Sequence, residues 1–183
     1  MARQAPDRLF IGLDANAAGV RELSRRAFRA RMPNLLYVRA AIENLPPELV
    51  GLADQVSVVL PWGSLLAAVA RPCVTLLGGI RALCQPDAQL TVVFSIDPDR
   101  DRTEVERLGL ARMGSDDFGG QLVSSYSAAG FRITSFRSLA AEELSRWPST
   151  WAKRLARGPS RSIWKLALRL GPSMYRSRRR RPS

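Results

Sequence analysis

The chain has 183 residues, 46% of them hydrophobic, and its 28 Lys and Arg against 16 Asp and Glu give a formal charge of +12. This length and composition predict one globular domain with a buried core. The sequence contains no His, which excludes mechanisms that depend on a Ser-His pair, a Cys-His pair or a His-bound metal.

The first half of the chain alternates strand-like and helix-like segments. Short apolar runs predict buried strands at residues 9–13, 35–38, 55–60 and 89–95. After the first of these, Asn16 is placed to cap an amphipathic helix. Two further helices are predicted at residues 65–70 and 74–83. Strands that alternate with helices in this way predict an α/β fold with a mostly parallel sheet.

The second half of the chain begins with a charged turn at residues 97–101, and the segment from there to residue 114 has no clear period. A helix is predicted at residues 121–129 with Gly130 as its C-cap. The remaining expectations are an antiparallel edge strand at 131–139, a short helix at 142–147, an irregular basic and aromatic connection at 151–157, and a last strand at 162–170. Residues 171–183 are too polar to pack, so we expect a disordered tail.

The positive charge is concentrated at the C-terminal end. Residues 1–143 hold 16 basic and 16 acidic residues, whereas residues 144–183 hold 12 basic residues and no acidic one. Clustered arginines favour a polyanionic partner, because contacts with phosphates release bound counterions. Nucleic acid and an anionic membrane surface are both compatible with this charge alone.

The rest of the composition indicates a cytoplasmic protein. The start of the chain lacks the apolar run of a signal peptide. The longest uncharged stretch, residues 55–70, is broken by Pro61 and Gly63 and is too short to cross a bilayer. Two cysteines, Cys73 and Cys84, are too few for a disulfide framework or a metal site, so we interpret both as small buried hydrophobes in a reducing cytosol and expect no metal.

Two segments lie where an α/β sheet usually binds nucleotides, at the carboxyl ends of its strands. Asp14 ends the first strand and is placed to accept both hydroxyls of a ribose, although an acid that caps the next helix explains it about as well. Ala41, Ile42 and Glu43 follow the second strand, where an adenine could lie, and an ordinary surface loop is an equal alternative.

Two tryptophans stand in contexts that favour binding over burial. Trp62 follows a buried strand between Pro61 and Gly63, which presents it at the ligand edge of the sheet. Trp151 stands among cations, a pattern that is typical of proteins that stack a nucleic-acid base on an aromatic ring. The alternative for Trp62 is packing in the core. The alternative for Trp151 is a ring at the loop surface or over the sheet edge. Exposed tryptophans without His suggest methyl transfer to a ring nitrogen, which needs alignment more than proton transfer.

The sequence resembles a known family, the aminoglycoside-resistance 16S rRNA methyltransferases of the Kam/Npm type. Members of this family methylate N1 of adenine 1408 with S-adenosylmethionine. The matching segments run in the family's order over most of the chain up to about residue 170, and they are residues 2–15, 34–37, 41–47, 60–66 and 149–155. The resemblance implies a Rossmann-like class I methyltransferase sheet with an antiparallel edge strand, in one domain over residues 1–170. It also implies resistance to kanamycin- and apramycin-type drugs.

The resemblance also implies roles for individual residues. Cofactor contacts are expected from Asp14, Ala41, Ile42, Glu43, Leu60, Pro61 and Trp62. Trp62 and Trp151 would sandwich the flipped target base, and Ser149 would help to position the second ring and the cofactor. Contacts with rRNA are expected from Arg25, Arg26, Arg29, Arg31, Lys153, Arg154 and Arg161. The implied partner is 16S rRNA in the 30S subunit, the implied state is a monomer, and no membrane is involved.

One feature of the family is missing from this sequence. Family members begin with a strand that ends in a loop of the Asp-x-Gly-x-Gly-Asp type, and the first 50 residues here contain only Gly12 and Gly19. We therefore expect a gap in the sheet between the strand of Asp14 and the strand that leads to Trp62, and an N-terminal truncation or a misassigned start. On this ground a non-enzymatic RNA-binding protein on a degenerate methyltransferase fold is the alternative function, and a peripheral membrane protein is a third.

Overall fold

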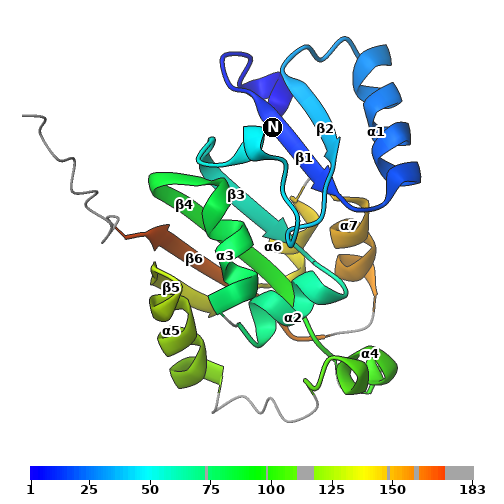
Figure 1. The fold of residues 1–183 in the computed structure, drawn as a ribbon. Helices are drawn as coiled ribbons and strands as arrows, with labels where there is room; N and C mark the ends of the chain where they lie inside the picture. Colours follow the sequence, from blue (N-terminus) through cyan, green and yellow to red (C-terminus); the bar gives the residue numbers. More distant parts are fainter. Residues whose placement is uncertain (73, 98, 111–117, 148, 159–160, 172–183) are drawn as a thin grey trace, which may run out of the picture. The chain divides into compact units, whose positions relative to one another are not determined.

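The computed structural model describes residues 1–72, 74–97, 99–110, 118–147, 149–158 and 161–171. They form two compact units, Met1–Pro47 and Glu48–Ser183, each of which is described by itself (Figure 1). The described strands form two sheets, one in each unit. The fold is mixed α/β, as predicted.

The first unit is a strand-helix-strand motif. A short 3-10 turn, η1 (Ala2–Gln4), precedes β1 (Phe10–Asp14), which pairs in parallel with β2 (Leu35–Arg39). The connection is α1 (Ala17–Arg29). Asn16 caps this helix as predicted, because its side-chain oxygen accepts hydrogen bonds from the backbone amides of Ala18 and Gly19.

The second unit is built on a four-stranded sheet in the order β3-β4-β6-β5. Its strands are β3 (Ala53–Val59), β4 (Cys84–Ser95), β5 (Phe131–Ser138) and β6 (Ile163–Leu170). The β3 and β4 strands are parallel, whereas β6 is antiparallel to both β4 and β5. The strand predicted at residues 131–139 is therefore an antiparallel edge strand, as expected.

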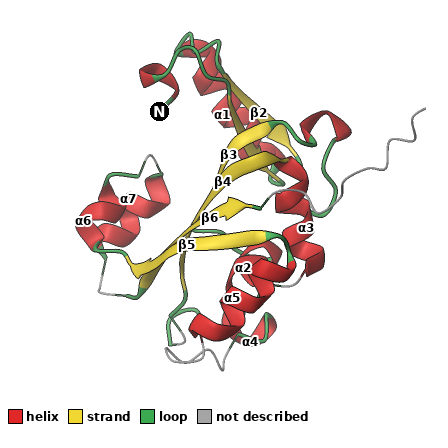
Figure 2. Ribbon diagram, turned by 90° about the vertical axis from the view of Figure 1, so that its left-hand side faces the viewer, coloured by secondary structure: helices red, strands yellow, loops and turns green. Residues whose placement is uncertain are grey.

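Helices cover both faces of this sheet (Figure 2). One face carries α2 (Ser64–Ala70), α3 (Val74–Leu83) and α5 (Phe118–Ala128), and the other carries α6 (Ala141–Ser145) and α7 (Thr150–Arg157). The remaining elements are the 3-10 turn η2 (Pro47–Leu49) and α4 (Arg102–Arg107).

The central strand β4 is buried on both faces. Leu90, Val92 and Phe94 alternate with Thr91 and Val93, and all but the half-buried Thr91 are at most 1% exposed. A strand that is apolar on both faces is stable only when both faces are shielded from water. This explains why helices pack on both faces of the sheet.

Two helices differ from the sequence predictions. The prediction of an irregular connection at residues 151–157 is wrong, because α7 occupies this segment. Its apolar residues Ala152, Leu155 and Ala156 have the helical spacing of one buried stripe, but the segment has only eight residues, which is short for a helix to be predicted from its period. The segment that begins at Arg102, for which no element was predicted, contains α4.

The cysteine prediction is confirmed for one of the two residues. Cys84 is buried, its thiol donates a hydrogen bond to the carbonyl of Ile80 at 3.3 Å, and burial raises the pKa of the thiol to about 11. Cys73 lies outside the described residues, as do residues 172–183, which hold nearly all of the expected disordered tail. In the described part of the chain no group of three or more acidic or Cys side chains could hold a metal ion.

No single helix among the described residues is long and apolar enough to cross a membrane. The helices α2 and α3 reach the required length and composition only together, and they are bent by 100° at the break between them.

Candidate active site

The loop after β3 presents Trp62 in an unusual backbone conformation. Leu60 has a φ of +49° and Gly63 a φ of +63°, so two of four consecutive residues lie in the left-handed region. For leucine this conformation costs about 1–2 kcal/mol, whereas glycine adopts it freely. The Leu60 amide donates a hydrogen bond to the carbonyl of Val93 at 2.7 Å. Pro61 is buried, and Trp62 is 54% exposed, as the sequence predicted for a ring at the ligand edge.

The second tryptophan lies in the first turn of α7. Ser149 is the N-cap, and its hydroxyl oxygen accepts a hydrogen bond from the Ala152 amide at 3.3 Å. The cap fixes the start of the helix, so it also fixes the position of Trp151, the second helical residue. The indole of Trp151 is 45% exposed, while Ala152 is fully buried.

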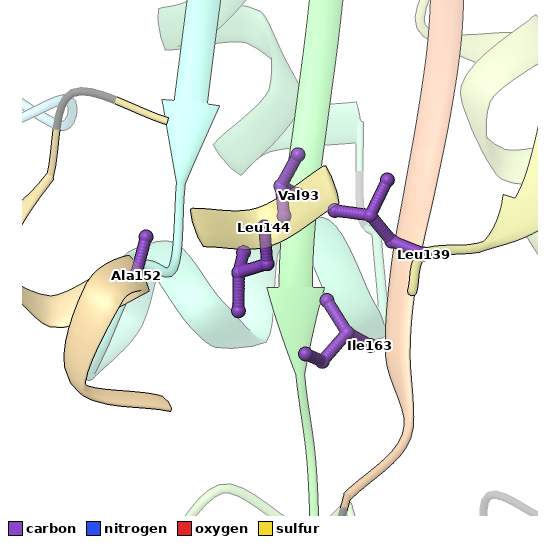
Figure 3. Packing of buried hydrophobic residues seen from close by; sticks show 5 residues of the cluster. All are labelled: Val93, Leu139, Leu144, Ala152 and Ile163. Carbon is purple, nitrogen blue, oxygen red and sulfur yellow. The ribbon is translucent and has the colours of Figure 1, made fainter. Parts of the chain in front are cut away.

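One hydrophobic cluster supports both tryptophan-bearing segments. Its buried members are Val93, Leu139, Leu144, Ala152 and Ile163 (Figure 3). Leu60, which lies just before Pro61 and Trp62, packs against the same cluster, as does Leu155 of α7. The structure therefore brings the Trp62 loop and the Trp151 helix to one part of the second unit.

Cations surround Trp151 on the surface of α7. Lys153, Arg154 and Arg157 are exposed, and the guanidinium carbon of Arg154 lies 5.5 Å from the centroid of the Trp151 ring. This cation–π contact occupies one face of the indole. Lys153 and Arg157 form no ion pair with any described residue, so both are available to an anionic partner.

Arg161 has a different environment from the one expected for a phosphate ligand. Its guanidinium forms an ion pair with Asp101, and the two side chains are only 10% and 11% exposed. Its Nε has no hydrogen-bond partner among the described residues. In this conformation Arg161 joins the segment before β6 to the start of α4, and its contact with an rRNA phosphate stays a prediction.

A buried glutamate that was not predicted contacts the residue after Trp62. Glu104 of α4 is 9% exposed, and its carboxylate accepts a hydrogen bond from the Gly63 amide at 3.0 Å. The segment 102–114 showed no clear period, so nothing in the sequence marked this glutamate as buried. Its only signal was the pair Glu104 and Arg107 at helical i,i+3 spacing.

The residues expected to bind the adenosine part of the cofactor belong to the first unit. Asp14 ends β1, is exposed, and accepts a hydrogen bond from the Asn16 amide on Oδ1 at 2.9 Å. The second carboxylate oxygen has no hydrogen bond recorded within the described residues. After β2, Ala41 and Asn44 form an isolated bridge that shapes the turn over the half-buried Ile42 and the exposed Glu43. An open carboxylate and a half-apolar turn at the ends of adjacent parallel strands fit a ribose and an adenine.

The outer face of α1 is strongly cationic. Arg25, Arg26 and Arg29 are exposed along the helix, and Arg31 follows it with a φ of +50°. Arg26 is paired with Glu22 at 2.8 Å, and its hydrogen bond lowers the pKa of that carboxyl below the usual value. No ion pair is recorded for the other three arginines in the described part of the chain, so they are available to an anionic surface.

Comparison with known proteins shows extensive similarity. The family model described as NpmA, 16S rRNA (adenine(1408)-N(1))-methyltransferase, matches residues 1–169. A 16S rRNA (adenine(1408)-N(1))-methyltransferase from Streptoalloteichus hindustanus is 35% identical over 160 residues, which are 85% of this chain and 73% of the relative.

Solved structures give the same result. The aminoglycoside resistance methyltransferase NpmB1 is 40% identical with a TM-score of 0.77, over 92% of this chain and 79% of its own. A variant of the 16S rRNA (adenine(1408)-N(1))-methyltransferase from Catenulisporales acidiphilia, solved with its cosubstrate SAM, is 27% identical with a TM-score of 0.77 and covers the whole of this chain.

Proposed function

The chain belongs to the NpmA family of 16S rRNA (adenine(1408)-N(1))-methyltransferases, and from this premise we propose that it methylates N1 of adenine 1408 in 16S rRNA, as an aminoglycoside-resistance enzyme. The observation that carries the proposal is the placement of Trp62 and Trp151. Two half-exposed indoles are held on segments that pack against one hydrophobic cluster. A flipped base needs such stacking surfaces.

The chemistry agrees with the residues present. N1 of adenine carries an in-plane lone pair and no proton, so its attack on a methyl carbon needs no general base. S-adenosylmethionine is the methyl donor of this family, and it supplies a methyl group on a sulfonium that leaves as a neutral thioether. The protein is then required to align the two reactants, a contribution that accounts for several kcal/mol in well-oriented reactions. A site without His is suited to this task.

The two indoles would hold the target base between them. Base stacking on an aromatic side chain is worth about 1–3 kcal/mol per base. Arg154 covers one face of Trp151, so the base would stack on the opposite face or displace the guanidinium. Lys153 and Arg154 would then contact the phosphates that flank the base.

Contacts with the cofactor are proposed in each unit, considered separately. Asp14 would accept the ribose hydroxyls, and the turn of Ala41, Ile42 and Glu43 would meet the adenine. Leu60 and Pro61 would close on the cofactor beside Trp62, as the family resemblance implies. Support comes from the exposed Asp14 carboxylate and from the half-apolar turn after β2.

The rRNA would be met by two cationic surfaces. One is the α1 face with Arg25, Arg26, Arg29 and Arg31, and the other is α7 with Lys153 and Arg154. Surfaces of this kind recognise the fold of an RNA through its phosphates, while the base itself is read by stacking. We propose that a monomer acts on the assembled 30S subunit.

The test is methylation of 30S subunits, read as a primer-extension stop at adenine 1408, together with 30S affinity. Trp62→Ala and Trp151→Ala should each lower methylation at least tenfold, with little change in affinity. Trp164→Phe is the matched control, because Trp164 stacks on Phe136 in the sheet, and it should behave like the wild type. Retained 30S binding without any stop would contradict the proposal and favour a non-enzymatic RNA-binding protein.

A further inference from the structure

Glu104 is one of two buried polar or charged residues among the described residues, with Ser95. Its two oxygens are both used. Oε1 accepts hydrogen bonds from the Gly63 amide at 3.0 Å and from Arg107 Nη2 at 2.7 Å, and Oε2 accepts one from Arg107 Nε at 2.8 Å. Arg107 itself is 59% exposed, and Oε1 is shared between its guanidinium and the Gly63 amide.

The Gly63 amide is a group that needs a partner. Gly63 is the N-cap of α2, where no side chain of the helix start accepts a hydrogen bond. Its φ of +63° and ψ of −141° suit glycine alone. The carboxylate of Glu104 comes from α4, a separate element, and a negative charge at a helix N-terminus is favourable.

The strained loop is held at both ends. On one side of Trp62, Leu60 is fixed by its hydrogen bond to Val93 and by its packing against the hydrophobic cluster. On the other side, Gly63 is fixed by Glu104. The indole between them is half exposed, and among the described residues no hydrogen bond donated by its Nε1–H orients it. The backbone on each side of the indole is therefore fixed by these two anchors.

We infer that Glu104 is a positioning residue for Trp62, which acts by holding the Gly63 amide and with it the direction in which the indole meets the target base. The expected effect of Glu104 on methylation rests on the proposed function. Its effect on the position of Gly63 and Trp62 does not. Hydrogen bonding by Arg107 lowers the pKa of Glu104, which keeps the carboxylate ionised as an acceptor at neutral pH. A misplaced stacking surface affects the reaction rate more than the docking of the whole subunit.

The helix α4 is itself held in place by an ion pair at its start. Asp101, at the N-cap position of this helix, pairs with Arg161, which precedes β6. Residues at the start and in the middle of one short helix thus contact the segment before β6 and the Trp62 loop. This fixes the place from which Glu104 reaches Gly63.

The experiment compares Glu104→Gln with Glu104→Met in the full chain. Glutamine keeps an acceptor for the Gly63 amide, whereas methionine has a similar length and none. Arg107→Gln is the control, because it removes the salt bridge and leaves the Gly63 bond. The readouts are the Gly63 amide and Trp62 indole resonances in ¹⁵N–¹H NMR spectra of the free chain, the single-turnover methylation rate and the 30S affinity.

We expect Glu104→Met to shift both resonances and to lower the methylation rate roughly 10- to 100-fold, with 30S affinity within about twofold of the wild type. Glu104→Gln and Arg107→Gln should keep both resonances near their wild-type positions and should keep most of the rate. Unchanged resonances in Glu104→Met would overturn the inference, as would an equal loss of rate in all three variants. Because the NMR readout needs no activity, a wild-type chain without methylation would contradict the proposed function and leave this test intact.

Discussion

Leu60 packs against the hydrophobic cluster that contains Ala152, so two residues far apart in the sequence share one core. Leu60 lies two positions before Trp62, and Ala152 follows Trp151 directly. The separation of the two indoles is thus determined by buried packing between a strand end and a helix. Packed cores resist deformation, so such a support suits a site that has to hold a flat base at a defined spacing.

The N-cap of α7 gives the first prediction. Ser149→Ala should destabilise the helix by about 0.5–2 kcal/mol, because the Ala152 amide loses its acceptor. The start of α7 should fray, and methylation should fall because Trp151 lies in this turn. Ser149→Asp should restore both. Hydrogen exchange of the α7 amides and the methylation rate are the measurements. Ser145→Ala, which removes a hydroxyl from the end of α6, should affect neither, and an equal effect of both substitutions would contradict the role of the cap.

The cationic face of α1 gives the second prediction. Arg25→Gln and Arg29→Gln should each lower 30S affinity and reduce the slope of log affinity against log salt concentration by about 0.7 to 0.9, since each removes one phosphate contact. Arg26→Gln should have a smaller effect, because Arg26 is held by Glu22. Glu22→Gln should act in the opposite direction and raise affinity. The measurement is a filter-binding titration at several salt concentrations, and identical slopes in all variants would show that α1 does not meet the rRNA.

The third concerns the close approach of β1 to β2. Gly12 lies directly opposite Tyr37 in the parallel pair, and a Cβ on Gly12 would come within 2.6 Å of two ring carbons of Tyr37. Gly12→Ala should therefore displace the ring and destabilise the first unit by about 1–3 kcal/mol. Limited proteolysis of residues 1–47 and chemical denaturation measure the effect. Gly19→Ala is the control in the same unit, because its Cβ would meet Asn16 at an ordinary 3.5 Å and remove a glycine from a helix interior, which should stabilise by about 0.5–1 kcal/mol.

The fourth is a pH dependence. Glu143 of α6 accepts hydrogen bonds from Arg137 of β5 at 2.7 and 2.8 Å, and this interaction lowers the pKa of Glu143 from its usual 4.5 to about 2. A carboxyl whose pKa is lowered on folding stabilises the folded state above its usual pKa. The contribution is lost as pH falls from 4.5 through 2.

Thermal melting of the wild type and of Glu143→Gln between pH 6 and pH 2 measures this loss. The wild type should melt at the higher temperature at pH 6, and the difference should shrink as pH falls below 4.5. A difference that is constant over this range would show that the ion pair does not stabilise the fold.

Much of the fold was predicted from local pattern. Strands β1 to β3 and the helices α1 to α3 lie close to their predicted ranges, and Asn16 caps α1, so short-range rules locate these elements. The strand β4 begins at Cys84, five residues before its predicted start. The helix α7 was missed because it is only eight residues long, so its amphipathic spacing covers little more than two turns. The helix is stabilised by packing against the hydrophobic cluster that includes Val93 and Ile163. These residues are distant from α7 in the sequence, so a short segment of sequence does not reveal the contact.

The candidate site divides in the same way. The exposure of Trp62 and Trp151 was predicted, because proline, glycine and clustered cations in the immediate sequence disfavour burial. The role of Arg161 was not, since its partner Asp101 lies in a segment without a clear pattern. Glu104 was not predicted for the same reason. In the sequence a buried glutamate cannot be distinguished from one on a helix surface, and only the hydrogen bond from Gly63 shows the difference.

By itself, the sequence determined the α/β class, the cationic C-terminal end, the absence of His chemistry and the family of the chain, because composition, periodicity and short motifs are properties of neighbouring residues. Only the tertiary structure decided which residues support the two indoles and which arginines form ion pairs within the described residues. Long-range pairs such as Leu60 with the α7 cluster, Gly63 with Glu104 and Arg161 with Asp101 depend on how distant segments pack. That packing is a property of the whole fold, and no local pattern encodes it.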